Sequence, residues 1–308
     1  MAVSIKELKK RPERLAPGHR ACAGCTGPTV LRHAMKMTDK NLVCSIATGC
    51  MEVSSSIYPF TAWNVSMIHS AFENSAATIS GVEAAYQKLK ADGKIDEEFK
   101  FIAFGGDGGT YDIGFQSLSG AMERGHDMVY VCYDNQAYMN TGIQRSSATP
   151  FGAHTNTAQA GSVKQGKEQH RKDLTAIMAN HNIPYAGQAA IHNINDYRRK
   201  LEKALETKGA CFINVLAPCH RGWRIPIDGG LDSSKLAVET CFWPLYEVEN
   251  GNWKLTYKPK EKLPITEWLK PQGRFKHLFK PGNEGMLEEI QSYVDRKWDE
   301  ILVRCGEK

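Results

Sequence analysis

The chain has 308 residues, of which 42% are hydrophobic, and its 39 basic and 34 acidic side chains leave a formal net charge of +5. This length and composition allow one large α/β domain or two modest ones, and they exclude an intrinsically disordered chain. Because the basic residues are spread along the chain, nucleic-acid binding is not expected. The basic stretch 1–15 lacks the apolar core of a signal peptide, and no apolar run approaches the roughly 20 residues of a membrane span, so we expect a cytoplasmic protein with no membrane partner.

Strand-like and helix-like segments alternate between residues 28 and 216. In chain order the sequence predicts a helix over 28–37, a strand over 42–47, a helix over 70–90, a strand over 101–104, a helix over 113–123, a strand over 128–133, a helix over 173–179, a strand over 185–190, a helix over 195–207 and a strand over 211–216. This alternation is typical of a doubly wound α/β fold with a mostly parallel sheet.

The amino-acid composition changes after Cys219, where Pro, Gly and Trp become frequent. Residues 246–256 predict a hairpin that turns at Asn250-Gly251, and residues 283–303 predict a closing amphipathic helix. We therefore expect residues 1–229 to form the α/β domain and residues 230–308 to form a C-terminal arm rather than a second independent core.

A glycine-rich loop, Gly105-Gly-Asp-Gly-Gly, follows the predicted strand at 101–104. Parallel sheets bind ligands at the carboxyl ends of their strands, and glycines let backbone amides approach phosphate oxygens. The next strand ends just before Asn135, so this side chain and the Ala137 carbonyl reach the same edge as Asp107. A carboxylate, an amide oxygen and a carbonyl are ligands that Mg²⁺ accepts. Gly-Asp-Gly alone favours a mere tight turn, but together with Asn135 it predicts a magnesium-bound diphosphate.

The nine cysteines fall into groups. Three lie in apolar, strand-like runs and are expected to be small buried hydrophobes: Cys44, Cys132 and Cys211. Two have no motif around them: Cys241 and Cys305. The remaining four stand beside Gly or Pro in turn-like segments that can wrap a metal centre: Cys22, Cys25, Cys50 and Cys219. Their spacing leaves an iron–sulfur cluster and a zinc ion equally open, whereas a thioredoxin-type dithiol would need a preceding strand.

Seven motifs resemble the beta subunit of pyruvate:ferredoxin oxidoreductase and its relatives, the 2-oxoacid:ferredoxin oxidoreductases, over about residues 17–223. The motifs are Pro17-Gly-His-Arg-Ala-Cys-Ala-Gly-Cys, Thr48-Gly-Cys-Met-Glu, Tyr58-Pro-Phe-Thr-Ala-Trp, His69-Ser-Ala-Phe-Glu-Asn-Ser-Ala-Ala, Gly105-Gly-Asp-Gly-Gly-Thr-Tyr-Asp-Ile-Gly, Asn140-Thr-Gly-Ile-Gln and Ala217-Pro-Cys-His-Arg-Gly-Trp. The resemblance implies the thiamine diphosphate-binding fold and the oxidative decarboxylation of pyruvate or a related small oxoacid.

The resemblance also implies the site residues. A proximal [4Fe–4S] cluster would be held by Cys22, Cys25, Cys50 and Cys219. Thiamine diphosphate would be bound by Gly49, Gly106, Asp107, Gly108, Gly109, Asn135, Asn140 and Thr141. Mg²⁺ would be held by Asp107, Asn135 and the Ala137 carbonyl. Cys50 and Asn140 would lie at the reacting end of the cofactor and are the candidate catalytic residues.

Partner subunits follow from the same resemblance. An alpha-type subunit would supply the aminopyrimidine half-site and the activating glutamate, so this chain alone is expected to be inactive. Gamma- and delta-type subunits with ferredoxin-like clusters would pass electrons to ferredoxin, and coenzyme A would be a co-substrate if the oxoacid is pyruvate. For the acids and histidines of these motifs we expect structural roles: Glu52, Glu73, Asp112, His19 and His69.

The sequence departs from the family pattern after Cys219, where His220-Arg221-Gly222-Trp223 replaces the usual Pro-x-Gly-Trp, and at Thr26, where glycine is common. A cation beside the cluster would favour its reduced form. The added charge also keeps oxalate open as a substrate, which would need no coenzyme A. Two further alternatives are a thiamine-dependent lyase without electron transfer and a zinc-stabilised binding module.

Overall fold

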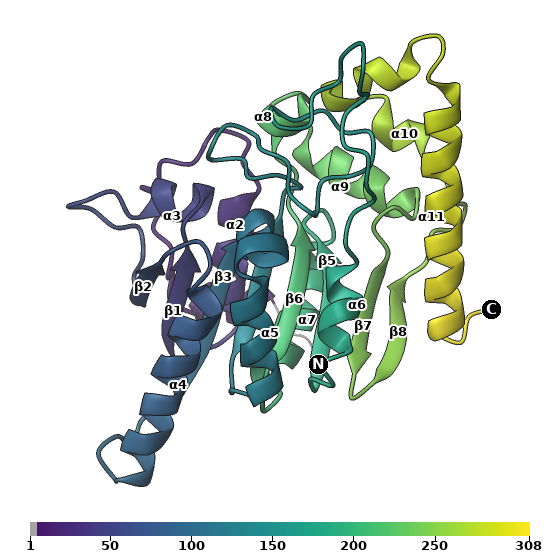
Figure 1. The fold of residues 1–308 in the computed structure, drawn as a ribbon. Coiled ribbons are helices and arrows are strands. Elements are labelled where there is room, and N and C mark those ends of the chain that lie inside the picture. The colour runs from purple at the N-terminus through teal and green to yellow at the C-terminus, as the bar shows by residue number, and fades with distance from the viewer. Residues whose placement is uncertain (1–4) are drawn as a thin grey trace.

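The structure, a computed structural model, describes residues 5–308, so the start of the basic N-terminal stretch lies outside the described residues. A single sheet of eight strands forms its centre (Figure 1). The strands are β1 (Asn41–Ala47), β2 (Ser66–Ser70), β3 (Phe99–Gly106), β4 (Val129–Asp134), β5 (Tyr185–Ala190), β6 (Cys211–Leu216), β7 (Leu245–Glu249) and β8 (Asn252–Tyr257).

The strand order is β2-β1-β3-β4-β6-β5-β7-β8, with β1 to β6 parallel and β7 and β8 antiparallel. The chain runs outward from β1 to β2 and then returns to place β3 on the other side of β1. The prediction of a doubly wound, mostly parallel sheet is confirmed. The order reverses between β1 and β3, and such a switch point opens a crevice at the carboxyl ends of the two strands.

Helices cover both faces of this sheet. They are α1 (Ile5–Lys10), α2 (Gly27–Lys36), α3 (Cys50–Ser55), α4 (Ser75–Ala91), a π-helix (Gly108–Ile113), α5 (Phe115–Arg124), α6 (Leu174–Ala179), α7 (Ile194–Glu206), α8 (His220–Trp223), α9 (Gly230–Glu239), α10 (Thr266–Leu269), a 3₁₀ helix (Gly273–Phe279) and α11 (Glu284–Arg304). Buried residues of α4, α5 and α6 pack on one face of the sheet, and those of α2 and α7 pack on the other (Figure 1). No helix among residues 5–308 is both long and apolar enough to cross a membrane.

Apolar content located most of the central elements correctly, and the strands at 185–190 and 211–216 begin and end where expected. Two expectations were wrong. The helix over 70–90 begins only at Ser75, because the preceding residues 66–70 form the edge strand β2, whose largely exposed, polar side chains hide it from a hydrophobicity pattern. The helix over 113–123 is preceded by a π-helical turn that the glycine-rich loop itself forms.

Residues 230–308 extend the sheet and cover its end. The predicted hairpin is present, and Asn250 and Gly251 have φ values of 48° and 80°, the left-handed conformation that a two-residue hairpin turn requires. Strand β7 pairs with β5, while Val294 and Trp298 of α11 are buried in the same hydrophobic cluster as α4 and α5 (Figure 1). The extension therefore completes the core of the α/β domain.

Candidate functional site

The predicted cofactor-binding residues come together at the switch point of the sheet. A cleft there is lined by the ends of β1, β3 and β4 and by the loop that follows β4. Its walls include Gly49, Cys50, Gly106, Gly108, Gly109, Asn135, Ala137, Asn140 and Thr141. Asp107, at the start of the π-helix, lies buried beside this cleft.

Asp107 is fully buried, and its two carboxylate oxygens are held separately. The Ser146 hydroxyl donates to Oδ2 at 2.5 Å, and the backbone N–H of Asn135 donates to Oδ1 at 3.2 Å. Burial, followed by the negative charge of Asp134, raises the pKa of Asp107 well above its ordinary value. A buried carboxylate in this position is stabilised by a cation, because a nearby positive charge offsets the cost of desolvation.

Three oxygen atoms lie close together here: the Asn135 side-chain oxygen, the Ala137 carbonyl oxygen and Asp107 Oδ1. The side-chain oxygen of Asn135 lies 2.8 Å from the Ala137 carbonyl oxygen and 3.0 Å from Asp107 Oδ1. Without a cation, the amide would be turned over so that its nitrogen donates to both oxygens. With Mg²⁺ at bonds of about 2.0–2.1 Å, ligands at right angles lie about 2.9 Å apart. The Asn135 oxygen therefore lies from each of the other two predicted magnesium ligands at the spacing of adjacent ligands in an octahedral site.

Gln136 bends the chain so that its two neighbours face the same point. Its φ is 68°, in the left-handed region that a non-glycine residue adopts only at an energetic cost. Its N–H donates to Asp134 Oδ1 at 3.0 Å and its carbonyl accepts the Thr149 hydroxyl at 2.7 Å. The Arg274 guanidinium donates to its side-chain oxygen at 2.6 Å. These bonds hold the strained residue and, with it, the Asn135 and Ala137 ligands.

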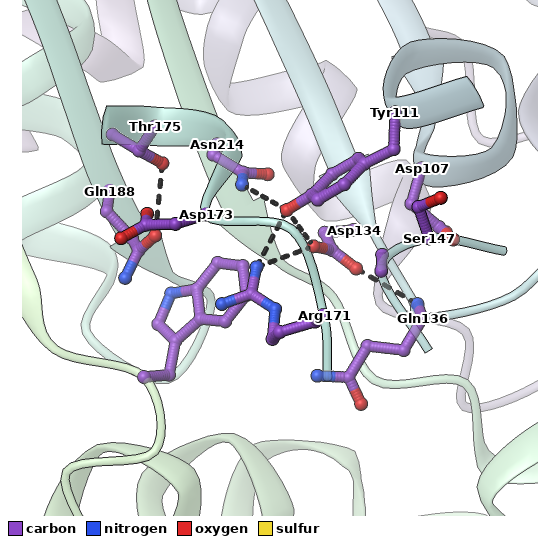
Figure 2. A network of polar contacts seen from close by, with 12 residues as sticks. Asp107, Tyr111, Asp134, Gln136, Ser147, Arg171, Asp173, Thr175, Gln188 and Asn214 are labelled. Atoms are coloured by element: carbon purple, nitrogen blue, oxygen red, sulfur yellow. Dashed lines mark hydrogen bonds and ion pairs between the residues drawn. The ribbon is translucent and has the colours of Figure 1, made fainter. Parts of the chain in front are cut away.

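A network of buried polar side chains surrounds Asp134 at the end of β4 (Figure 2). The Tyr111 hydroxyl donates to Asp134 Oδ2 at 2.6 Å, while Asn214 and Arg171 each donate to the Tyr111 oxygen at 2.7 Å. Arg171 also forms an ion pair with Asp134 at 3.4 Å. Because Asp134 ends β4 directly before Asn135, the network fixes the origin of the loop that carries the magnesium ligands.

Two glycines of the loop are required by close contacts. A Cβ atom on Gly108 would lie 2.3 Å from the Tyr138 ring, and one on Gly109 would lie 3.0 Å from the backbone oxygen of Phe72. Tyr138 packs edge-on against the Phe72 ring, so neither neighbour is free to move aside. The π-helix thus starts with bare backbone facing the cleft, as a phosphate-binding loop requires.

The four candidate metal cysteines line a second cavity of about 210 Å³ beside the cleft. Cys22 is exposed, and Cys25, Cys50 and Cys219 are half-buried. Burial, and to a smaller extent the neighbouring Cys219 and Cys22 thiols, raise the pKa of Cys25 to about 11. Burial, with Cys219, Cys25 and Cys22, raises the pKa of Cys50 to about 12. The thiols are therefore close enough to influence one another although they come from three segments of the chain.

The cavity and the cleft share a wall. Cys50, Tyr133, Asn135 and Asn140 line both spaces. The two candidate catalytic residues, Cys50 and Asn140, are thus part of the partition between them. Within residues 5–308, no group of three or more His, Cys, Asp or Glu side chains is arranged to hold a single metal ion.

The C-terminal extension reaches this site through Arg274, which stacks on Trp223. The Trp223 indole N–H donates to the Asn135 carbonyl at 2.8 Å, and the Arg274 guanidinium lies 4.0 Å from the centre of the Trp223 ring. Trp223 ends the short helix that begins after Cys219, so it connects the magnesium side with the cysteine side. Sequence reasoning missed Ser146, Gln136 and Arg274, because nothing in their local sequence signals a contact with residues so far away.

Three of the other residues singled out in the motifs make structural contacts: His69, Glu52 and Asp112. The Thr48 hydroxyl bonds His69 Nε2 at 2.8 Å, Glu52 lies 3.5 Å from His69 Nδ1, and the Ser147 N–H donates to Asp112 at 2.9 Å. Cys44, Cys132 and Cys211 are fully buried, so the prediction that they are small core residues is confirmed.

Comparison with known proteins decides the family. The C-terminal TPP-binding domain of thiamine pyrophosphate enzymes matches residues 47–215. Pyruvate synthase subunit PorB of Thermotoga maritima is 50% identical over 313 residues, covering 98% of this chain and 96% of that protein. The same subunit of Methanocaldococcus jannaschii is 52% identical over 289 residues, covering 93% and 96%. The chain belongs to the beta subunits of the 2-oxoacid:ferredoxin oxidoreductases.

Other relatives of this beta subunit act on other oxoacids. Ketoisovalerate oxidoreductase subunit VorB of Pyrococcus furiosus is 41% identical over 303 residues, covering 96% of both chains. A solved 2-oxoglutarate:ferredoxin oxidoreductase from Magnetococcus marinus aligns with a TM-score of 0.55 at 19% identity, covering 67% of this chain and 66% of that one, which shows the fold alone. Because the chain is a subunit of a thiamine diphosphate-dependent oxidoreductase, the alternative of a zinc-stabilised binding module is excluded.

Proposed function

We propose that this beta subunit serves a pyruvate:ferredoxin oxidoreductase, and that it carries both the magnesium–diphosphate half of the thiamine site and one proximal [4Fe–4S] cluster. The observation that carries the proposal is the wall shared by the cleft and the cysteine cavity. Groups held on its two sides are separated by single side chains. An electron released in the cleft can therefore pass directly to a centre in the cavity.

Mg²⁺ fits the cleft through Asp107, Asn135 and the Ala137 carbonyl. The distances from the Asn135 oxygen to the other two groups, together with a buried carboxylate that forms no ion pair within residues 5–308, support this assignment. The bare backbone of Gly108 and Gly109 would face the diphosphate oxygens, with Gly49 and Gly106 completing the cradle. When bound, thiamine diphosphate supplies an electron sink for the carbanion left by decarboxylation.

A [4Fe–4S] cluster fits the cavity through Cys22, Cys25, Cys50 and Cys219. Four thiols lining one space of about 210 Å³ support this assignment over scattered, independent cysteines. The raised pKa values of Cys25, Cys50 and Cys219 describe the metal-free protein, because a coordinating thiol is deprotonated outright. Cys50 would hold the cluster from the shared wall, while Asn140 and Thr141 would face the reacting end of the cofactor.

The cleft is open and needs a partner. We assign the activating glutamate and the aminopyrimidine half-site to an alpha-type subunit, and the onward electron path to gamma- and delta-type subunits and ferredoxin. Tyr58 and Phe60 lie on the loop after α3 and are 94% and 71% exposed. The same part of the chain lines the cysteine cavity through Val53 and Ile57. Exposed aromatic side chains beside an incomplete site support a subunit contact there.

Pyruvate is the favoured substrate, because relatives named pyruvate synthase are 50% and 52% identical over nearly the whole chain. Oxalate is the alternative that the charge of Arg221 keeps open. The test is the purified complex, assayed for iron and for ferredoxin reduction with pyruvate or oxalate, each with and without coenzyme A. We expect about four irons at this subunit and coenzyme A-dependent activity with pyruvate.

Two results would change the assignment. Activity with oxalate alone, independent of coenzyme A, would replace the substrate but keep the cluster. Full decarboxylating activity in a complex whose beta subunit contains no iron would establish the lyase alternative and remove the cluster.

A further inference from the structure

One buried polar group in the shared wall has no partner. Tyr133, near the end of β4, is only 2% exposed, and its hydroxyl forms no hydrogen bond within the described residues. A buried hydroxyl is normally satisfied, because leaving it unpaired forfeits the bond it made to water. The exception points to an acceptor that the polypeptide itself does not supply.

The surroundings of this hydroxyl show where the acceptor lies. Tyr133 is the register partner of Gly106 on β3, and a Cβ atom built on Gly106 would lie 3.2 Å from the ring. A Cβ atom on Gly49 would lie 3.0 Å from the Tyr133 hydroxyl oxygen. The hydroxyl therefore sits against the backbone that leads directly into Cys50. Tyr133 also shares a hydrophobic cluster with Cys25 and Cys50, on the side of the sheet that faces the cysteine cavity.

The hydroxyl is set up as a donor. A tyrosine hydroxyl carries its proton at neutral pH and can donate one hydrogen bond. A Cβ atom on Gly49, the residue before Cys50, would lie 3.0 Å from the hydroxyl oxygen, so this oxygen lies beside the start of α3. Its proton is left for an acceptor in the cavity.

We propose that the Tyr133 hydroxyl donates a hydrogen bond to a sulfur of the centre in the cysteine cavity, either the Cys50 thiolate or a cluster sulfide, and so raises the reduction potential of that centre. This inference rests on the proposed [4Fe–4S] cluster. Hydrogen bonds to cluster sulfurs stabilise the more negative, reduced state. Tyr133 is thereby a positioning and tuning residue: it makes the cluster a better acceptor for electrons released across the wall.

The test is Tyr133→Phe in the complete complex, which removes one oxygen and keeps the ring that separates the two spaces. We expect unchanged iron content, a cluster potential shifted to a more negative value in an electron paramagnetic resonance titration, and the loss of one exchangeable proton coupled to the reduced cluster in electron–nuclear double resonance after transfer to D₂O. A hydroxyl with a merely structural role would alter the melting temperature and leave the potential and the coupled proton unchanged.

Tyr246→Phe is the matched control. Tyr246, on β7, is 1% exposed, and its hydroxyl also forms no hydrogen bond within residues 5–308, but it lines a different cavity far along the sheet. Removal of its hydroxyl should leave the cluster potential where it is.

The outcomes separate this inference from the function on which it rests. A wild-type complex without iron at this subunit would overturn both. An iron-loaded Tyr133→Phe complex with the wild-type potential and coupled proton would overturn the inference alone, as would a loss of thiamine diphosphate affinity with the potential unchanged, since the hydroxyl would then serve the cleft. Loss of iron from a folded variant would also overturn it, because a hydrogen-bond donor tunes a cluster but does not ligate it.

Discussion

The two halves of the site are built in different ways. The magnesium side is assembled from the ends of adjacent parallel strands, and each of its groups is held by buried hydrogen bonds. The cysteine side is assembled from three segments that meet across the fold, and one of its thiols, Cys22, is exposed. From this difference we infer that the polypeptide alone positions the proposed magnesium ligands, whereas the proposed cluster would fix the positions of the four thiols.

Hydrogen bonds hold the cysteine segments together, and one of them, from the Arg20 N–H to the Ser54 carbonyl at 2.7 Å, ties the first segment to α3. The backbone N–H of Cys25 donates to the Cys22 carbonyl at 3.0 Å and closes the first turn. The Thr26 hydroxyl donates to the Pro218 carbonyl at 3.0 Å and ties this turn to the segment of Cys219. Thr26 is one of the departures from the family pattern, and the structure gives it this role.

The largest effect is expected for Asp107→Ala, which removes a ligand from the preformed side. Without this buried carboxylate, Mg²⁺ loses a charged ligand, and we expect affinity for thiamine diphosphate to fall by more than about 100-fold. The cysteine cavity should keep its iron, because its residues do not depend on Asp107. Equilibrium binding of thiamine diphosphate and iron analysis on the same samples check this, and unchanged cofactor affinity would contradict the magnesium assignment.

Cys50→Ser tests the opposite half. We expect loss or damage of the cluster at this subunit, measured as a fall in iron per complex and in the electron paramagnetic resonance signal, because serine is a poor ligand for iron in place of a thiolate. Magnesium-dependent binding of thiamine diphosphate should persist. Cys44→Ser is the control, because Cys44 is fully buried in β1 and does not line the cavity. Undiminished iron in Cys50→Ser would remove Cys50 from the ligand set.

Thr26→Val should have a smaller effect on the same half. Valine keeps the shape of threonine but leaves the buried Pro218 carbonyl without its donor, which costs about 1–3 kcal/mol. We expect the cluster to form but to be lost faster when the complex is exposed to an iron chelator. A rate of iron release equal to that of the wild-type complex would show that the two cysteine segments are held together by other contacts.

Arg221→Met should have the smallest effect. Arg221 is exposed on the helix after Cys219, and solvent screens its charge from the cavity. We expect a more negative cluster potential than in the wild type, but a shift smaller than that of Tyr133→Phe. The potentiometric titration of both variants under one set of conditions decides between them, and a larger shift for Arg221→Met would place the main control of the potential at the surface.

The sequence predicted those parts of the molecule that depend on local pattern. Buried strands are mostly apolar runs, so β5 and β6 were placed correctly although each contains one amide side chain. The convergence of Asp107 and Asn135 follows from their positions after neighbouring parallel strands. The predicted site residues lie around one edge of the sheet, although their roles remain proposals. Edge strand β2 was missed because its side chains are mostly polar and exposed.

The supporting contacts could not be predicted, because they join distant parts of the chain. Arg274 reaches Gln136 across 138 residues, and Asn214 reaches Tyr111 across 103. The left-handed backbone conformation of Gln136 could not be predicted either, because glutamine has no preference for that conformation. Such residues are recognised only when the fold shows which buried donors face which acceptors.

The position of Arg274 has a consequence for anyone seeking a minimal version of this subunit. A fragment cut at the end of the predicted α/β domain would lose Arg274, whose guanidinium bonds Gln136 and stacks on Trp223. It would also lose the two strands that protect the edge of β5. Such a fragment would keep every predicted ligand in its sequence, but it would lack the contact that holds Gln136 between Asn135 and Ala137. The last quarter of the chain supports the proposed magnesium site, and engineering efforts should treat the subunit as indivisible.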